Sequence, residues 1–387
     1  METTADPAMR QALLERAAAL VPTLRKRSAH CEALRRIPDE TIADYLELGI
    51  HRIAQPRRFG GMGLGIDTVT DVAIEIGRGC GSTAWMAGQW AGHNFMVGNF
   101  PEEAQKEYWS DSFDVLSSTA SAIVRCDARD VPGGFHVSAQ LKFSSGVDAA
   151  QWLLLLLPTR HCLVPRSDFE ILDDWHVAGL RGTGSKSVLL KDVFVPAYRT
   201  VEVEALVNGR AYGAELYPDN PYYQVPFSPV LNTMLLAPTI GMARGLLELF
   251  DERVRVRVDG HTATPAYQRP GTQLRFAEAS VEVDTAVLLL RRMLDDFVEW
   301  GSSGKPMPLS ERARIRRDVA YAARQCIRAA DRLLESGDAS AMYDNQLVQR
   351  WARDIHMAGL QIALTWDEPA MSYSQVCWGL PPVSKMT

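Results

Sequence analysis

Apolar residues in the first 112 positions recur at the three- and four-residue steps of an amphipathic helix. Helices are predicted over residues 38–48 and 66–78, with the glycine-rich turn RFGGMGLG between them. A further helix is predicted through the stretch STAWMAGQWAGHNF. We therefore expect residues 1–112 to form an N-terminal helical domain. Its first helix would bury one apolar stripe, made of Leu13, Leu14, Ala17, Leu20 and Leu24.

Residues 113–205 show a different pattern, in which short apolar runs alternate with turn residues. Turn signals include the Pro-Gly-Gly sequence at 132–134 and the Arg-Gly-Thr-Gly sequence at 181–184. This regular spacing is typical of a small antiparallel barrel or sandwich. We therefore expect a middle β domain, with strands around residues 115–116, 135–137, 152–157, 162–164, 187–190 and 193–195.

The remaining residues, 206–387, return to a helical pattern. The stretch 206–229 is rich in Pro, Tyr, Asn and Gly and is predicted to be a connector, with aromatic side chains that line a pocket or form a subunit contact. Four long helices then predict a C-terminal bundle. The chain is accordingly expected to have an α+β fold of N-terminal helices, a β middle and a four-helix bundle. The four helices are predicted over residues 246–258, 273–300, 309–336 and 346–373.

Composition narrows the classes of function. Lys and Arg number 41 and Asp and Glu number 47, a net charge of −6, which argues against a nucleic-acid binder. The longest unbroken apolar run, residues 152–157, is too short to span a membrane. The N-terminus lacks the basic start and apolar core of a signal peptide, so a cytoplasmic protein is expected. The six cysteines and eight histidines are scattered, with no CxxC or HExxH, so no metal site is predicted.

Four segments resemble one known family. They are PRRFGGMGLG, CGSTAWMAGQWAGHNF, FHVSAQLKFSSGVDAAQWLLLL and YDNQLVQRWARDIHMAGLQIALTWD. Together they resemble the flavin-dependent monooxygenase branch of the acyl-CoA dehydrogenase fold, which includes 4-hydroxyphenylacetate 3-hydroxylases and hydroxylases of steroid-ring phenols. The resemblance covers essentially the whole chain and implies the same order of helices, β domain and helical bundle.

The resemblance also implies a reaction. Such a protein is the oxygenase component of a two-component system, which receives reduced flavin, FMNH2 or FADH2, from a separate NAD(P)H-flavin reductase. With dioxygen as co-substrate, a flavin C4a-hydroperoxide would hydroxylate a bulky aromatic or polycyclic substrate, or an amine. A homotetramer is expected, because helix 273–300 and the last helix carry apolar residues on more than one face and need cover on both sides.

Two alternatives stay open, an acyl-CoA dehydrogenase and a non-redox member of the fold that cyclises or binds a ligand. The dehydrogenase alternative is weakened because the strand SSTASAIVRCDARD replaces the Glu-Pro-x-x-Gly-Ser-Asp loop of those enzymes. It is weakened further because Gln361 lies where a catalytic carboxylate is expected, with Glu368 seven residues on. An amide cannot accept a proton at neutral pH.

The resemblance implies a set of site residues. His93, with a pKa near 7, would supply or hold a proton near the oxygen that leaves. The hydroxyl of Ser145, or less favourably Ser144, would contact flavin N5. Gln361 replaces the His that phenol hydroxylases usually carry, so it would orient a substrate without deprotonating it. Flavin contacts are expected from Trp85, Ser118, Thr119, Ser121, Phe143, Ser145 and Arg257, whereas Arg350, Arg353 and Asp354 are predicted to form ion pairs.

Overall fold

Helices form the N-terminal part of the chain, as predicted. The computed structural model describes residues 6–258, 263–337 and 339–384. Helix α1 continues through Pro22, as the predicted stripe that includes Leu24 requires, and its buried side chains on both sides of that proline pack against the core. The helices of this part are α1 (Pro7–Leu34), α2 (Asp39–Leu48), α3 (Ile66–Gly77), α4 (Gly81–Val97) and α5 (Glu102–Tyr108).

The middle of the chain forms two four-stranded sheets, in the orders β1-β4-β5-β8 and β2-β3-β7-β6. Strands β1 and β4 pair in parallel, and the other neighbours are antiparallel. Inward-facing residues of both sheets form a separate apolar core, as in a sandwich. The strands are β1 (Ser117–Ala120), β2 (Ala122–Val131), β3 (Gly134–Ser144), β4 (Trp152–Leu156), β5 (Arg160–Pro165), β6 (Glu170–Leu172), β7 (Lys186–Pro196) and β8 (Thr200–Glu202).

The predicted strands at 187–190 and 193–195 are one strand, β7. Its register with β3 shifts opposite Val137–Ala139, and Asp192 takes a left-handed conformation with φ +50°. The polar residues Lys191 and Asp192, which separate the two predicted strands, therefore lie in a bulge within one continuous strand.

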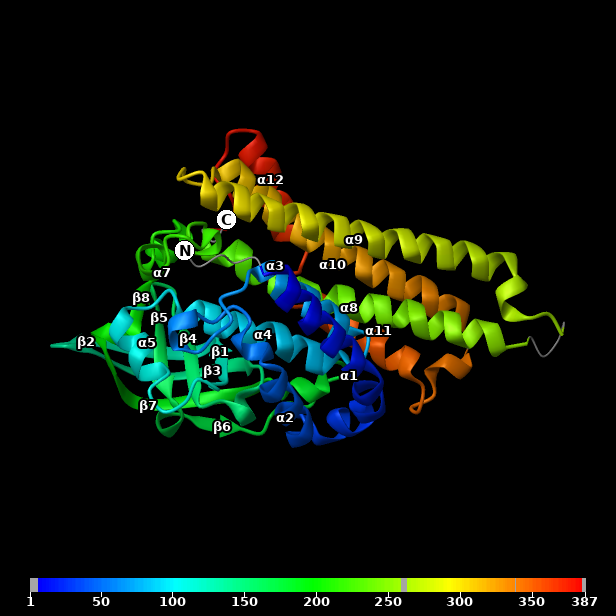
Figure 1. Cartoon of the computed structure of the whole chain (residues 1–387), viewed down its shortest axis with the longest axis horizontal. Coiled ribbons are helices and arrows are strands. Elements are labelled where there is room, and N and C mark those ends of the chain that lie inside the picture. The colour runs from blue at the N-terminus through cyan, green and yellow to red at the C-terminus, as the bar shows by residue number, and fades with distance from the viewer. Residues whose placement is uncertain (1–5, 259–262, 338, 385–387) are drawn as a thin grey trace.

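The C-terminal part is a bundle of α8, α9, α10 and α11 that extends past the sheets (Figure 1). The sheets lie at one end of the molecule, and the facing ends of α8 and α9 lie at the other end (Figure 1). The helices are α6 (Val203–Val207), α7 (Tyr212–Leu216), α8 (Phe227–Val256), α9 (Pro270–Ser302), α10 (Leu309–Gly337), α11 (Leu347–Gly359) and α12 (Asp367–Cys377).

Helix α8 begins about five turns earlier than the predicted start at residue 246. Pro229 lies in its first turn, where the missing N–H has no helical partner, and Pro238 lies inside the helix in a fully buried setting. Of the described residues, α8 alone is long and apolar enough to cross a membrane. However, 78% of its apolar window is buried within the protein, which is typical of the core helix of a bundle.

Two other expectations about this part were wrong. The predicted helix 346–373 is broken after Gly359 by a turn that contains Gln361, and α12 starts at Asp367. The connector 206–229 contains α7 and the short 3-10 helix Pro221–Tyr223, and its aromatic side chains are mostly core residues: Tyr223 stacks on Phe95 with ring centroids 4.5 Å apart. They therefore complete the packing of α4, and only Tyr212 is well exposed.

Candidate functional site

The predicted site begins where strand β3 ends. Phe143 has φ +65°, a left-handed conformation that is uncommon for a bulky residue. The residue is 57% exposed, and its ring meets that of Trp175 edge to face, with centroids 6.1 Å apart. At Gly146, φ is +68°, and an added Cβ would lie 2.3 Å from Met86 Cε. The strand end is therefore held directly against helix α4, with an aromatic ring directed outward.

Three predicted hydroxyl residues meet at this strand end. Ser118 on β1 donates to the carbonyl oxygen of Ser145 at 2.8 Å. Ser144 is fully buried, and its Oγ has no hydrogen-bond partner among the described residues. Ser145 Oγ lies 2.8 Å from Ser185 Oγ, a contact that the sequence analysis did not anticipate. An unpaired buried hydroxyl is unfavourable, so we infer that the Ser144 hydroxyl bonds to a polar atom of a bound ligand.

His93 lies inside helix α4 and is fully buried. Its Nδ1 is 2.7 Å from the carbonyl oxygen of Ser117, and its Nε2 is 2.9 Å from Gln89 Oε1. Burial lowers the pKa of His93 to about 4, so the expected pKa near 7 was wrong. The imidazole is therefore neutral at physiological pH, and it fastens α4 to β1 beside Ser118.

Trp85 and Trp90 lie on the same helix. Trp85 is buried, and Trp90 Nε1 is a buried donor without a partner in the described structure. An added Cβ at Gly146 would lie 3.1 Å from that indole nitrogen. Helix α4 thus faces the end of β3 with Trp90, and the flavin contact expected of Trp85 stays a prediction.

The remaining predicted flavin contacts are Thr119, Ser121 and Arg257. Thr119 is half-buried on β1, and Ser121 is exposed between β1 and β2. Arg257 caps the C-terminus of α8, and its Nη1 donates to the Ser336 carbonyl at 3.4 Å. That end of α8 is at the far end of the bundle (Figure 1). One chain therefore does not bring Arg257 to Ser145.

Gln361 lies in the turn that follows α11. Its side-chain oxygen accepts a hydrogen bond from the backbone N–H of Ala363 at 2.6 Å. The residue is half-buried, between the exposed side chains of Leu360 and Ile362. In the described part of the chain no hydrogen bond uses its amide nitrogen, so this N–H2 group can donate to another molecule.

The predicted ion pairs on α11 have a different partner. Arg350 and Arg353 bind Glu32 of α1, with N–O distances of 2.5 and 2.8 Å, and not Asp354. Asp354 instead accepts a hydrogen bond from the backbone N–H of Leu180 at 2.6 Å. Burial raises the pKa of Asp354 to about 7. The spacing of Arg350, Arg353 and Asp354 correctly predicted that they share one face of a helix. It could not reveal that α1, which carries Glu32, packs against that face.

Sequence reasoning also missed Ser185 and Thr183, which lie directly behind Ser145. Thr183 Oγ1 is 2.6 Å from Ser185 Oγ and donates to the Leu180 carbonyl at 2.8 Å. Both residues belong to the segment RGTGSKS, which contains the short 3-10 helix Arg181–Thr183. The only sequence signal was a glycine-rich turn just before β7.

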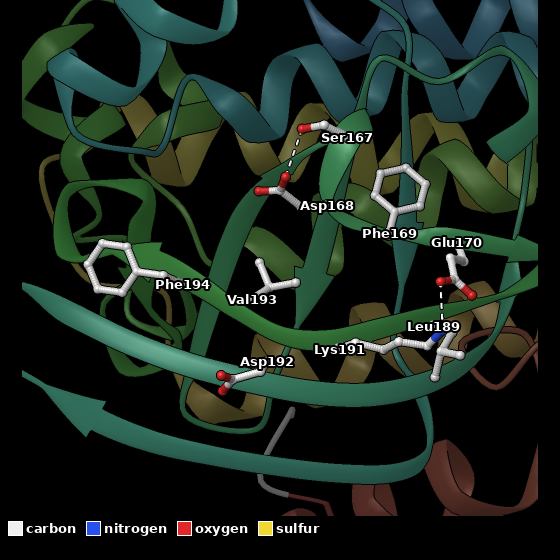
Figure 2. A pocket seen from close by; sticks show the side chains of 9 residues that line it. All are labelled: Ser167, Asp168, Phe169, Glu170, Leu189, Lys191, Asp192, Val193 and Phe194. Atoms are coloured by element: carbon white, nitrogen blue, oxygen red, sulfur yellow. Dashed lines mark hydrogen bonds and ion pairs between the residues drawn. The ribbon is translucent and has the colours of Figure 1, made fainter.

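Figure 2 shows a surface hollow of about 450 Å³ on the sheet formed by β6 and β7. Its polar groups already have partners: Ser167 donates to Asp168 at 2.7 Å, and Lys191 pairs with Glu170 at 2.7 Å. None of the predicted site residues lines it. We therefore place the functional site at the end of β3 and not in this hollow. In the described ranges, no three His, Cys, Asp or Glu side chains are arranged to hold a metal ion.

The strand end fits a flavin in three respects. Phe143 offers an exposed ring on which a flat ring system can pack. Ser144 Oγ and Trp90 Nε1 are buried polar atoms that need a partner. The Ser145 hydroxyl, although bonded to Ser185, still has oxygen lone pairs available. These polar atoms and the Phe143 ring therefore match the polar edge and the apolar face of an isoalloxazine ring.

Comparison with known proteins identifies the family of this chain. Residues 8–113 match the family described as acyl-CoA dehydrogenase, N-terminal domain, and residues 233–366 match acyl-CoA dehydrogenase, C-terminal domain. The chain is 33% identical over 386 residues to the oxygenase subunit HsaA of a flavin-dependent monooxygenase from Rhodococcus jostii. That alignment covers 96% of this chain and 100% of the relative. The chain belongs to the oxygenase components of flavin-dependent monooxygenases.

Other relatives agree with this assignment. The FADH2-dependent resorcinol hydroxylase, oxygenase component, of a Rhizobium species is 31% identical and covers 96% of this chain and 95% of its own. The crystal structure of 3-HSA hydroxylase from Rhodococcus sp. RHA1 superposes with a TM-score of 0.90 at 32% identity, over 97% of this chain and 99% of that one. The family and the α+β fold are thereby confirmed. These relatives favour an oxygenase component over the acyl-CoA dehydrogenase alternative.

Proposed function

We propose that this oxygenase component hydroxylates an aromatic substrate with reduced flavin and dioxygen, at the strand end of β3. The observation that carries the proposal is the junction of β3 with α4, where the exposed Phe143 ring, the unpaired Ser144 hydroxyl and the Ser145 hydroxyl lie together. Reduced flavin supplies the electrons with which dioxygen is activated. A separate flavin reductase would deliver it, as the term oxygenase component in the relatives' names implies.

Each residue at the junction has a distinct task in this proposal. The Phe143 ring packs on one face of the bound ring system and shields it from water. The hydroxyls of Ser144 and Ser145 hold its polar edge. Neutral His93 keeps its Nδ1 proton on the Ser117 carbonyl and fixes the neighbouring hydroxyl of Ser118 in register with Ser145. A direct proton transfer by His93 stays a prediction.

The side-chain amide of Gln361 bears on the kind of substrate that the protein would bind and orient. Helix α11 runs beside the loop that precedes β7, since an added Cβ at Gly179 would lie 2.9 Å from Met357 Cβ. Gln361 follows about one turn later and retains a free amide N–H2 group. An amide donor matches a substrate with an oxygen acceptor, such as a carbonyl or an already acidic phenol. We therefore propose an electron-rich, bulky aromatic or polycyclic substrate that needs no enzymatic base.

Transfer of labelled oxygen tests this proposal directly. The protein is mixed anaerobically with chemically reduced FMN or FAD and a panel of phenols, including resorcinol, and then exposed to isotopically labelled dioxygen. We expect one labelled oxygen atom in a hydroxylated product, detected by mass spectrometry. Reduced flavin without protein is the control. Peroxide as the sole oxygen product across a broad panel that includes polycyclic phenols would contradict the proposal.

We also propose that the chain assembles as a homotetramer. Leu274, Val281 and Leu288 follow each other at seven-residue spacing on α9 and are all exposed. This stripe is not covered by the β domain or the N-terminal helices, and it matches the seam of a helix–helix contact. Light scattering should give about four times the chain mass of 42.9 kDa. We expect Leu288→Asp to reduce the measured mass, whereas the control Asp284→Ala, on the same helix, should leave it unchanged. A mass of one chain for the parent protein would refute the assembly.

A further inference from the structure

Three hydroxyl groups form a chain of hydrogen bonds behind the end of β3. Ser145 Oγ is 2.8 Å from Ser185 Oγ, and Ser185 Oγ is 2.6 Å from Thr183 Oγ1. Thr183 in turn donates to the carbonyl oxygen of Leu180 at 2.8 Å. All three hydroxyl residues are buried, so bulk water does not compete for these bonds. The chain therefore behaves as a fixed unit.

The direction of each bond follows from the protons available. A hydroxyl donates one hydrogen bond, and a carbonyl oxygen can only accept. Since Thr183 donates to the Leu180 carbonyl, its oxygen must accept from Ser185. The oxygen of Ser185 then accepts from Ser145. The proton of Ser145 is thus directed away from the strand end, and a ligand there meets only oxygen lone pairs.

The carbonyl at the end of this chain is itself held in place. Leu180 has φ +51°, and its N–H donates to Asp354 Oδ1 of α11 at 2.6 Å. The same carbonyl accepts from the backbone N–H of Thr183 at 3.1 Å and from Trp175 Nε1 at 3.4 Å. A carbonyl fixed by this many bonds cannot rotate away easily, so the polarity of the whole chain is set by the fold.

We propose that Ser185 and Thr183 are positioning residues that make the Ser145 hydroxyl an acceptor, and that this acceptor selects reduced over oxidised flavin. The inference rests on the proposed function and on the contact between the Ser145 hydroxyl and flavin N5 that the family resemblance implies. N5 of a reduced flavin carries a hydrogen and donates, whereas N5 of an oxidised flavin can only accept. The acceptor hydroxyl pairs with the reduced form and faces the oxidised form lone pair to lone pair.

Anaerobic binding of both redox forms tests the inference without turnover. Kd values for reduced and oxidised FMN and FAD are measured for the parent, Ser185→Ala and Thr183→Val. In Ser185→Ala the Ser145 proton is released and can be donated to oxidised N5. We expect the preference for the reduced form to fall about tenfold, the effect of one hydrogen bond. The midpoint potential of the bound flavin should then become about 30 mV more negative.

Thr183→Val is the sharper variant, because it leaves Ser185 and Ser145 in contact but removes the acceptor that orients them. It should shift the preference in the same direction. Ser185→Thr, which keeps a hydroxyl, should restore the parent ratio. Ser187→Ala is the matched control: it deletes another buried hydroxyl of β7, whose bond leads to Asp174 at 2.5 Å, and should leave the ratio unchanged.

The outcomes separate the two proposals. If the parent binds neither form of flavin, the proposed function itself fails. If the parent prefers reduced flavin but Ser185→Ala and Thr183→Val keep that preference unaltered, only the hydroxyl chain is refuted. A parent with equal affinity for both forms, or an equal shift in Ser187→Ala, would also overturn it.

Discussion

Helix α4 and the end of strand β3 form two sides of one junction, but they treat their polar groups differently. On α4, His93 is fully buried, and its ring nitrogens lie 2.7 Å from the Ser117 carbonyl oxygen and 2.9 Å from the side-chain amide of Gln89. On β3, Ser144 has no partner, Ser145 keeps free lone pairs, and Phe143 is exposed. The comparison teaches that His93 supports the site from within α4, whereas the strand end, together with the unpaired Nε1 of Trp90 that faces it, is left ready to contact a ligand.

The largest effect should follow from removing His93. His93→Ala empties a fully buried site and leaves the Ser117 carbonyl and Gln89 without their partner. We expect a loss of about 3 kcal/mol in the free energy of unfolding, measured in urea without ligand. Ser145→Ala is the matched change on the other side and should lose less than about 1 kcal/mol. If the His93→Ala protein were as stable as the parent but inactive, His93 would act in the reaction and would not mainly support the fold.

Acid should also affect the two sides unequally, since α4 carries a fully buried histidine at the junction. Burial lowers the pKa of His93 to about 4, below its unfolded value near 6.5. The contribution of neutral His93 to the free energy of unfolding is thus fully present above pH 6.5 and is lost as the pH falls toward 4. Between about pH 7 and pH 5, we expect His93 to account for about 2 kcal/mol of lost stability.

The pH test compares slopes between variants. His51 and His161 have pKa values lowered to about 4 by burial and act in the same direction. Asp354, with its pKa raised to about 7, acts in the opposite direction, because its contribution grows as the pH falls. The slope of unfolding free energy against pH is therefore measured in the parent and in His93→Gln. Parallel slopes would show that His93 is not a buried neutral group.

Sequence patterns were sufficient for the order of helices, strands and bundle, and the resemblance pointed to the strand end KFSSG. They were insufficient where packing overrides local preference. Pro22 and Pro238 lie inside helices because buried neighbours stabilise those helices in spite of them. Ser185 was missed because its contact with Ser145 spans 40 residues of sequence. Such a contact depends on the pairing of β3 with β7, which periodicity does not specify.

Ser144 offers a test of whether the strand end is prepared for a ligand. Its unpaired, fully buried hydroxyl is unfavourable in the free protein. Ser144→Ala should therefore stabilise the ligand-free protein by about 1 kcal/mol and weaken binding of reduced flavin. Thermal unfolding with and without reduced flavin measures both effects. A destabilised variant with unchanged flavin binding would mean that Ser144 has an unnoticed structural partner.

The smallest effect on stability should come from Phe143, and it separates the two sides most cleanly. The residue is 57% exposed, so Phe143→Ala removes little buried apolar surface and should change the free energy of unfolding by less than about 0.5 kcal/mol. Trp85→Ala, on the buried face of α4, should lose about 3 kcal/mol or more. Reduced flavin should nevertheless bind about tenfold more weakly to Phe143→Ala, because a stacked aromatic contact is lost.

Because Phe143 has φ +65°, Phe143→Gly serves as a second variant that also relieves backbone strain. If either variant binds reduced flavin as tightly as the parent, the ring system does not pack on Phe143, and the flavin must lie elsewhere along the junction.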